Sequence, residues 1–153
     1  MKILITGGAG FIGSALIRYL IRLTDTNVIN IDSLTYSANL EALEEAHDHA
    51  RYSFEHLDIT NASGLSDIFR HHQPDSVIHL AAESHVDRSI DGARPFIETN
   101  IVGTYTLLET TWRYFKELDP LAQKKFKFLH VSTDEVFGSL NGVEASNEKQ
   151  PYH

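Results

Sequence analysis

The sequence contains no cysteine among its 153 residues, which excludes disulfide bonds, thiolate nucleophiles and cysteine-ligated zinc. Basic residues are also few: 13 Lys and Arg stand against 21 Asp and Glu, and the formal net charge is −8. This acidic balance argues against a nucleic acid or an anionic membrane as the main partner, because both bind basic surfaces. Uninterrupted apolar runs extend over only a few residues, so we expect no segment to span a bilayer.

The amino terminus has no apolar stretch of signal-peptide length, and a cytoplasmic location is expected. Apolar residues make up 42% of the chain, which is ordinary for a globular protein. The nine histidines show none of the spacings that are typical of metal ligands, so we expect no metal site. His79 and His130 lie in apolar runs and are predicted to be core residues bonded to the backbone.

Short apolar runs alternate along the chain with longer segments of helical periodicity. This alternation predicts βαβ units and a doubly wound parallel α/β sheet of the Rossmann type, with strand order 3-2-1-4-5. Ligands bind to such sheets at the carboxyl ends of the strands, so the residues there become the candidates for function. The predicted strands are 2–6, 27–32, 52–57, 75–81 and 126–132, and the predicted helices are 11–23, 39–49, 62–72 and 94–118.

A glycine-rich turn follows the first predicted strand, with Gly7, Gly10 and Gly13 spaced as G-x-x-G-x-x-G. Such glycines permit a tight turn, and the helix that follows presents free N–H groups and a positive dipole end to a pyrophosphate. Asp32 ends the second strand about 20 residues on, where an acid bonds the ribose 2′-OH and repels a 2′-phosphate. The pattern predicts an NAD site, the alternative being that the glycines only form a turn.

Two further strand ends add candidates for the same crevice. Asp58 and Ile59 follow the third strand and are predicted to flank an adenine, although Asp58 is equally suited to be the acid at a helix amino terminus. Leu80, Ala81 and Ala82 follow the fourth strand, where small side chains let a cofactor approach the backbone. Alternatively, these three residues only form a tight turn where the chain leaves the strand, and they contact no ligand.

Chemically reactive side chains gather in residues 83–89, after the fourth strand, and in residues 132–138, after the fifth. Within the second stretch, Asp134 and Glu135 are adjacent, so they face one substrate only if the strand has ended and the backbone turns. Two carboxylates in one desolvated crevice act as an acid and a base, and the Thr133 hydroxyl is a candidate for a substrate oxygen. Alternatively, the pair lies in a solvated loop or helix cap.

Five segments together resemble the nucleotide-sugar dehydratases of the extended short-chain dehydrogenase/reductase family. They are residues 6–14 (TGGAGFIGS), 32–36 (DSLTY), 81–90 (AAESHVDRSI), 96–109 (FIETNIVGTYTLLE) and 132–138 (STDEVFG). The resemblance extends from Met1 to about Gly138, and its most specific element is the Thr-Asp-Glu triplet. It implies NAD as a bound cofactor and a 4,6-dehydration that yields a 4-keto-6-deoxy sugar, with dTDP-glucose as the expected substrate.

The resemblance also implies a role for individual residues. Asp134 would be the proton donor and Glu135 the proton acceptor, while Ser84 and Thr133 would bind the glucosyl group. Ser33 departs from the family, which usually has Lys there. The implied NAD contacts are Phe11, Ile12, Asp32, Ser33, Leu34, Thr35, Asp58, Ile59, Leu80, Ala81, Ala82, Glu83, Ser84 and Thr99.

The family oxidises the sugar with the tyrosine of a Tyr-x-x-x-Lys motif, and these 153 residues contain no such motif. We therefore expect residues 1–153 to be a single NAD-binding domain, incomplete at its carboxyl end, from the amino-terminal part of a homodimeric dehydratase. A free-standing NAD-binding module and a related UDP-sugar dehydratase, decarboxylase or epimerase are the alternatives. An apolar stripe on predicted helix 94–118, including Ile97, Ile101, Leu108 and Trp112, is expected to be partly exposed and to promote self-association.

Overall fold

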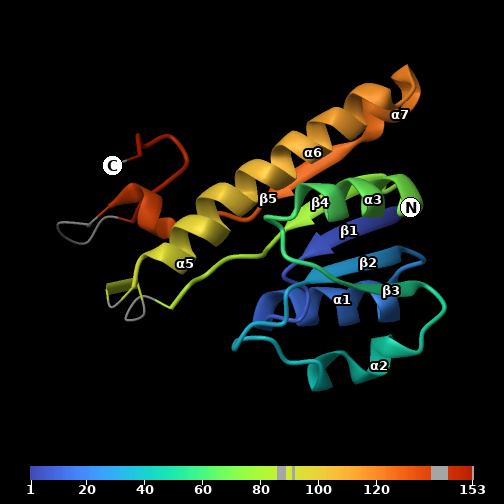
Figure 1. The fold of residues 1–153 in the computed structure, drawn as a ribbon, viewed down its shortest axis with the longest axis horizontal. Helices are drawn as coiled ribbons and strands as arrows, with labels where there is room; N and C mark the ends of the chain where they lie inside the picture. The colour runs from blue at the N-terminus through green and yellow to red at the C-terminus, as the bar shows by residue number, and fades with distance from the viewer. Residues whose placement is uncertain (86–88, 91, 139–144, 153) are drawn as a thin grey trace.

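The computed structural model describes residues 1–85, 89–90, 92–138 and 145–152, and a five-stranded parallel sheet lies at its centre (Figure 1). The strand order is β3-β2-β1-β4-β5, which confirms the prediction. The carboxyl ends of all these strands therefore meet at one edge of the sheet. The strands are β1 (Lys2–Thr6), β2 (Asn27–Asp32), β3 (Tyr52–His56), β4 (Ser76–His79) and β5 (Lys127–His130).

Alternate side chains of β1 enter two different hydrophobic cores, one on each face of the sheet. Ile3 and Ile5 pack in the same core as Ile17 of α1, whereas Leu4 packs in the same core as Phe69 of α3. In Figure 1, α1 and α2 lie on one side of the sheet, and α3 and α6 lie on the other. Burial on both faces explains why the central strands are almost continuously apolar. These helices are α1 (Phe11–Leu23), α2 (Glu44–His47), α3 (Ala62–His72) and α6 (Thr104–Glu117).

Most predicted boundaries hold to within two residues, and one helix is clearly shorter. Helices 11–23 and 62–72 are confirmed at both ends, and the Asn61 side chain caps α3 by accepting a 3.0 Å hydrogen bond from the backbone N–H of Gly64. The predicted helix 39–49 is reduced to a 3₁₀ turn, η1 (Glu41–Leu43), followed by the single turn of α2. The last predicted strand, 126–132, is shortened to β5.

The predicted long helix 94–118 is present, but its middle is wider than an α-helix. It consists of α5 (Arg94–Phe96), a π-helical stretch η2 (Ile97–Gly103) and α6, with α-region backbone angles at both joints. Sequence analysis missed α7 (Pro120–Lys125). The signal for it was present, because Asp119 accepts hydrogen bonds from the backbone N–H groups of Leu121 and Ala122, and Pro120 occupies the first helical position.

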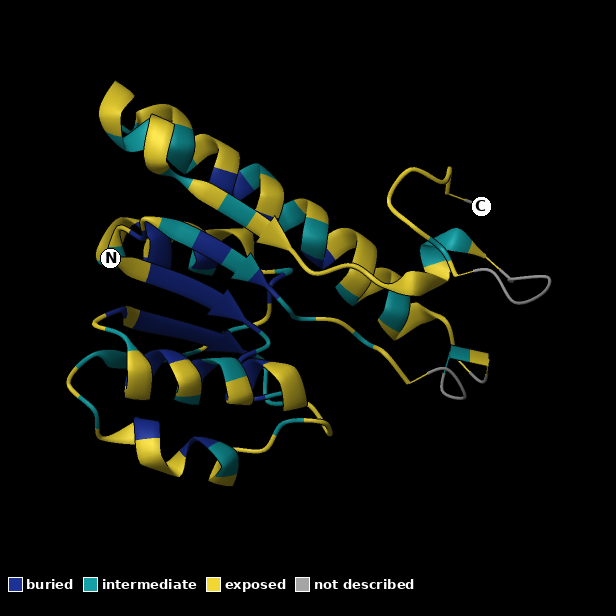
Figure 2. Cartoon of the chain, turned by 180° about the vertical axis from the view of Figure 1, so that it is seen from behind, coloured by how far each residue is buried: buried dark blue, intermediate teal, exposed yellow. Residues whose placement is uncertain are grey.

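The outer face of the long helix, defined here as Ile97 and Ile101 of η2 with Tyr105, Leu108 and Trp112 of α6, is exposed. Each of these side chains keeps at least 46% of its surface accessible. Figure 2 shows exposed residues along the length of this helix, interspersed with intermediate and buried ones, and the helix projects beyond the sheet. The expected exposure of the apolar stripe is therefore confirmed, whereas self-association remains a prediction. Within the described ranges, none of the helices has the length and apolar character needed to cross a membrane.

Candidate functional site

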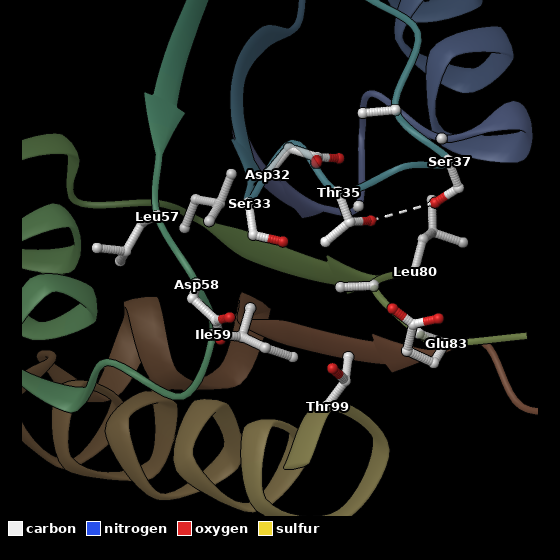
Figure 3. A pocket seen from close by; sticks show the side chains of 16 residues that line it. Asp32, Ser33, Thr35, Ser37, Leu57, Asp58, Ile59, Leu80, Glu83 and Thr99 are labelled. Atoms are coloured by element: carbon white, nitrogen blue, oxygen red, sulfur yellow. Dashed lines mark hydrogen bonds between the residues drawn. The ribbon is translucent and has the colours of Figure 1, made fainter. Parts of the chain in front are cut away.

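A cavity opens where the carboxyl ends of the strands meet, and loops that follow β1, β2, β3 and β4 surround it (Figure 3). Thr99 of η2 closes it from the side of the long helix. Most residues predicted to contact the cofactor line this cavity, although Phe11, Ile12, Gly13, Leu34 and Ser84 do not. The lining residues are Gly7, Gly10, Ile31, Asp32, Ser33, Thr35, Ser37, Ala38, Leu57, Asp58, Ile59, Leu80, Ala81, Ala82, Glu83 and Thr99.

The glycine-rich loop packs so closely that side chains would not fit. Gly7 has a φ of +72°, and a Cβ atom there would lie 2.6 Å from the backbone nitrogen of Ala81. A Cβ atom at Gly13 would lie 2.2 Å from the carbonyl oxygen of Gly7. Because real Cβ atoms essentially never approach so closely, these glycines bring the loop, α1 and the exit of β4 together. Gly7 and Gly13 therefore permit close packing of neighbouring segments in addition to forming a turn.

The amino terminus of α1 is left open by its own sequence. Gly10 is the N-cap residue, so no side chain caps the helix, and the first turn contains no acidic residue. Phe11 and Ile12 expose 94% and 63% of their surfaces. An uncapped helix amino terminus carries a partial positive charge and unpaired N–H groups, which suit a phosphate group. This geometry fits the role predicted for the backbone of these two residues.

Asp32 holds two loops together as well as facing the cavity. One carboxylate oxygen accepts a 2.8 Å hydrogen bond from the backbone N–H of Ala9, and the other accepts a 2.8 Å bond from that of Leu34. The side chain is 9% exposed. Leu34 takes a φ of +53°, an uncommon conformation for a residue with a side chain. Since a carboxylate accepts about four hydrogen bonds, Asp32 retains acceptor capacity for a ribose.

Asp58 lies both in the cavity wall and in the turn before α3, and its predicted contact with an adenine remains a prediction. It lines the cavity, and one carboxylate oxygen accepts 2.8 Å hydrogen bonds from the backbone N–H and the hydroxyl of Thr60. It is therefore a turn residue just before α3, whose N-cap is Asn61. Its neighbour Ile59 is 5% exposed and packs against η2, where a Cβ atom on Gly103 would lie 2.7 Å from its side chain. Gly103 thus allows the long helix to approach this wall of the cavity.

A buried histidine connects β1, β4 and α6. The Thr6 hydroxyl lies 3.3 Å from the backbone N–H groups of both Leu80 and Ala81, and 2.7 Å from Nδ1 of His79. With both lone pairs accepting from the backbone, the hydroxyl donates to Nδ1, and Nε2–H of His79 donates to the Thr104 hydroxyl at 2.9 Å. Burial, together with the nearby His130, lowers the pKa of His79 to about 4, so the ring is neutral at pH 7.

Two predictions about histidines need correction. His79 is a core residue, as expected, but its ring bonds to two hydroxyl groups rather than to the backbone. His130 is exposed, because β5 is the outermost strand of the sheet among the described residues. Within the part of the chain that the structure describes, no group of three or more His, Asp or Glu side chains lies close enough to hold a metal ion.

Asn100 is a site residue that sequence analysis missed. Its side-chain oxygen accepts a 2.8 Å hydrogen bond from the backbone N–H of Glu83, and its amide nitrogen donates a 2.9 Å bond to the carbonyl oxygen of Glu83. This two-point contact attaches the segment after β4 to η2, directly beside the cavity. The sequence does not predict this contact, because a single asparagine in a predicted helix is expected to be a surface residue and has no pattern that pairs it with Glu83.

The carboxylate pair lies outside this cavity, in the first turn of η3 (Asp134–Phe137). The Thr133 hydroxyl caps this turn by accepting a 3.2 Å hydrogen bond from the backbone N–H of Glu135. β5 has ended at His130, so the predicted turn of the backbone is present. Thr133, Asp134 and Glu135 are all exposed, which matches the alternative of a solvated helix cap. The roles predicted for them, and for the exposed Ser84, remain predictions, and residues 86–88 of the polar stretch after β4 lie outside the described residues.

Comparison with known proteins identifies relatives over almost the whole chain. A family model described as GDP-mannose 4,6 dehydratase matches residues 4–153. The dTDP-glucose 4,6-dehydratase 1 of Escherichia coli (strain K12) is 58% identical over 150 residues, which are 98% of this chain and 42% of that protein. The dTDP-glucose 4,6-dehydratase of Haemophilus influenzae is 57% identical over 154 residues, 100% of this chain and 46% of that protein. The chain thus spans less than half the length of these curated relatives.

A solved structure agrees with these sequence relatives. The dTDP-glucose 4,6-dehydratase of Streptomyces venezuelae, solved with NAD bound, matches the fold with a TM-score of 0.85 and 40% identity. The match covers 100% of this chain and 45% of that one. The chain therefore shares its fold with a relative solved with NAD bound.

Proposed function

The chain belongs to the GDP-mannose 4,6 dehydratase family, and we propose that residues 1–153 are the NAD-binding domain of a dTDP-glucose 4,6-dehydratase. The observation that carries this proposal is the identity of 58% to a curated dTDP-glucose 4,6-dehydratase over 98% of the chain. The Thr133-Asp134-Glu135 triplet supports it further, because the resembled dehydratases contain this triplet and related epimerases usually lack its Asp-Glu pair.

The residues of the cavity fit NAD in three respects. The glycine loop brings α1 and the exit of β4 close together at the cavity, the open amino terminus of α1 suits a pyrophosphate, and Asp32 has acceptor capacity for a ribose. Asp58 and Ile59 form the wall beside Thr99, where the adenine is expected. When bound, NAD would accept a hydride from the sugar and later return it.

The chain's own acid and base would perform the elimination of water. Once C4 of the sugar is a ketone, the C5 proton is acidic, and the Glu135 carboxylate removes it. Asp134 donates a proton to the C6 hydroxyl, so the C6–O bond breaks and water leaves. Thr133 and Ser84 hold the glucosyl group. An acid and a base in such positions each accelerate a reaction by about 10²–10⁴-fold.

The exposed outer face of the long helix supports a second part of the proposal. In the full-length enzyme, which we place in the cytoplasm, this apolar surface lies against the remainder of the protein and a second subunit. Contiguous exposed apolar patches of this kind mark protein–protein contacts.

A chimera tests the activity directly. In it, this chain replaces the matching segment of the E. coli relative, of which it covers 42%. The chimera should convert dTDP-glucose to a product that has lost one water, as measured by mass spectrometry. A product of unchanged mass with inverted C4 stereochemistry would identify an epimerase instead. NADH binding to the 153-residue chain, followed by fluorescence, tests the cofactor separately.

A further inference from the structure

One side-chain contact joins two walls of the cavity. The Tyr36 hydroxyl donates a 3.0 Å hydrogen bond to the Glu83 carboxylate, across 47 residues of sequence. Glu83 lines the cavity, and Tyr36 lies between two lining residues, Thr35 and Ser37. Figure 3 shows Ser37 and Glu83 at the same end of the cavity, on segments that leave β2 and β4. The contact therefore bridges the loop after β2 and the loop after β4.

The two ends of this bridge are held differently. Asn100 binds both the N–H and the carbonyl oxygen of Glu83, which fixes the backbone of Glu83 to η2. Tyr36 lies in a turn after β2, which the Ala38 N–H closes by donating a 3.0 Å hydrogen bond to the carbonyl oxygen of Thr35. Asp32 accepts from Leu34 at its start, and the Asn39 N–H donates 2.8 Å to the carbonyl oxygen of Ala9 at its end. The Tyr36–Glu83 bond thus connects a segment attached to η2 with the turn after β2.

We propose that Tyr36 and Glu83 form a strap that retains the cofactor, an inference that rests on the proposed NAD binding. A hydroxyl that donates to an ionised carboxylate makes a stronger hydrogen bond than one between neutral groups. While the bond persists, the two loops stay together at one end of the cavity, and a dinucleotide between them leaves only after it breaks. Retention suits a reaction that returns its hydride and regenerates its cofactor within each cycle.

The test measures NADH release from the 153-residue chain by stopped-flow fluorescence, with excess NAD⁺ as the displacing ligand. Tyr36→Phe should release NADH about threefold to tenfold faster, which is the effect of losing one hydrogen bond to a charged group at a partly exposed site. The association rate should change far less, because the strap acts on the bound state. Tyr19→Phe is the matched control, since Tyr19 is 58% exposed on α1, and it should release NADH at the wild-type rate.

A double-mutant cycle separates the strap from a general loosening of the loop. Glu83→Ala should also speed release, and Tyr36→Phe should have a smaller effect in the Glu83→Ala background than in the wild type, because the Tyr36–Glu83 bond is already lost. Effects that multiply in the double variant would overturn the strap, as would an unchanged release rate in Tyr36→Phe. A wild-type chain that fails to bind NADH in an equilibrium titration overturns the proposed cofactor as well, so the two failures are distinguishable.

Discussion

The predicted cofactor residues and the predicted acid–base residues lie in very different surroundings. Asp32 is 9% exposed, and each of its carboxylate oxygens accepts a backbone hydrogen bond. Asp134 and Glu135 are exposed in the first turn of a short 3₁₀ helix, and neither lines the cavity. The first region is organised by contacts within the described residues. The second region has carboxylates suited to catalysis, but within the described residues the side chains of Asp134 and Glu135 remain exposed to solvent.

This difference implies that binding and chemistry are separable. NADH binding should be a property of the 153-residue chain, because its contacts come from loops after β1 to β4. Turnover should appear only when a low-dielectric crevice surrounds the carboxylates, since acid–base pairs depend on desolvation for their different pKa values. The following predictions test this separation, beginning with the largest expected effect.

Glu135→Gln should eliminate dehydration in the chimera while leaving cofactor binding intact. Removing the base should slow product formation by about 10²–10⁴-fold, the usual contribution of such a group. Mass spectrometry measures the product, and fluorescence titration of the 153-residue variant measures NADH affinity. The matched control is Glu148→Gln, an exposed residue outside the predicted site. A variant with full dehydration activity would remove Glu135 as the base.

Gly13→Ala should abolish NADH binding and strongly destabilise the fold. The new Cβ atom would lie 2.2 Å from the carbonyl oxygen of Gly7 and 2.6 Å from Cα of Gly8, so the loop and α1 must separate. Overpacking of this kind costs about 3 kcal/mol. Urea denaturation gives the free energy of unfolding. Gly92→Ala is the control, because a Cβ atom there meets nothing within 4 Å, and equal losses in both variants would contradict the prediction.

Stability should fall as the pH is lowered from about 6.5 to about 4. The His79 pKa is about 4 in the folded chain, against an ordinary value of 6.5, because its ring is buried. In this window the unfolded chain binds a proton that the folded chain does not, so the free energy of unfolding decreases by on the order of 2–3 kcal/mol.

Urea denaturation at pH 7 and pH 5 measures the change. His79→Gln lacks the titrating group, so its unfolding free energy should depend less on pH over the same range. An equal pH dependence in the wild type and His79→Gln would assign the effect to other groups.

Asp32→Ala should weaken NADH binding about tenfold. Loss of the carboxylate leaves the Ala9 and Leu34 N–H groups without their acceptor, and a hydrogen bond to a charged group contributes about 1.5–3 kcal/mol. Fluorescence titration measures the affinity. Asp25→Ala removes an exposed acid beside α1 and should leave the affinity unchanged. Unaltered binding in Asp32→Ala would refute the predicted placement of the cofactor.

Sequence analysis predicted the sheet order and most cavity residues because both depend on local patterns. Apolar runs joined by amphipathic helices define the strands, and Gly7, Gly10 and Gly13 mark a turn that has few alternatives. Errors arose where neighbours in space decide the outcome. The apolar sequence around His130 predicted a core residue, but β5 is the outermost strand among the described residues and leaves His130 exposed.

The amino-acid sequence by itself determined that this chain would fold as alternating strands and helices with a glycine turn and an acid at the end of β2. Only the tertiary structure decided which contacts form around the cavity. The Asp32 carboxylate accepts hydrogen bonds from the N–H groups of Ala9 and Leu34. The Asn100 side chain binds the backbone of Glu83, and the Tyr36 hydroxyl donates to the Glu83 carboxylate. The physical reason is that periodicity and turn propensity act over a few residues. These contacts instead join residues up to 47 positions apart, which only the packed sheet brings together.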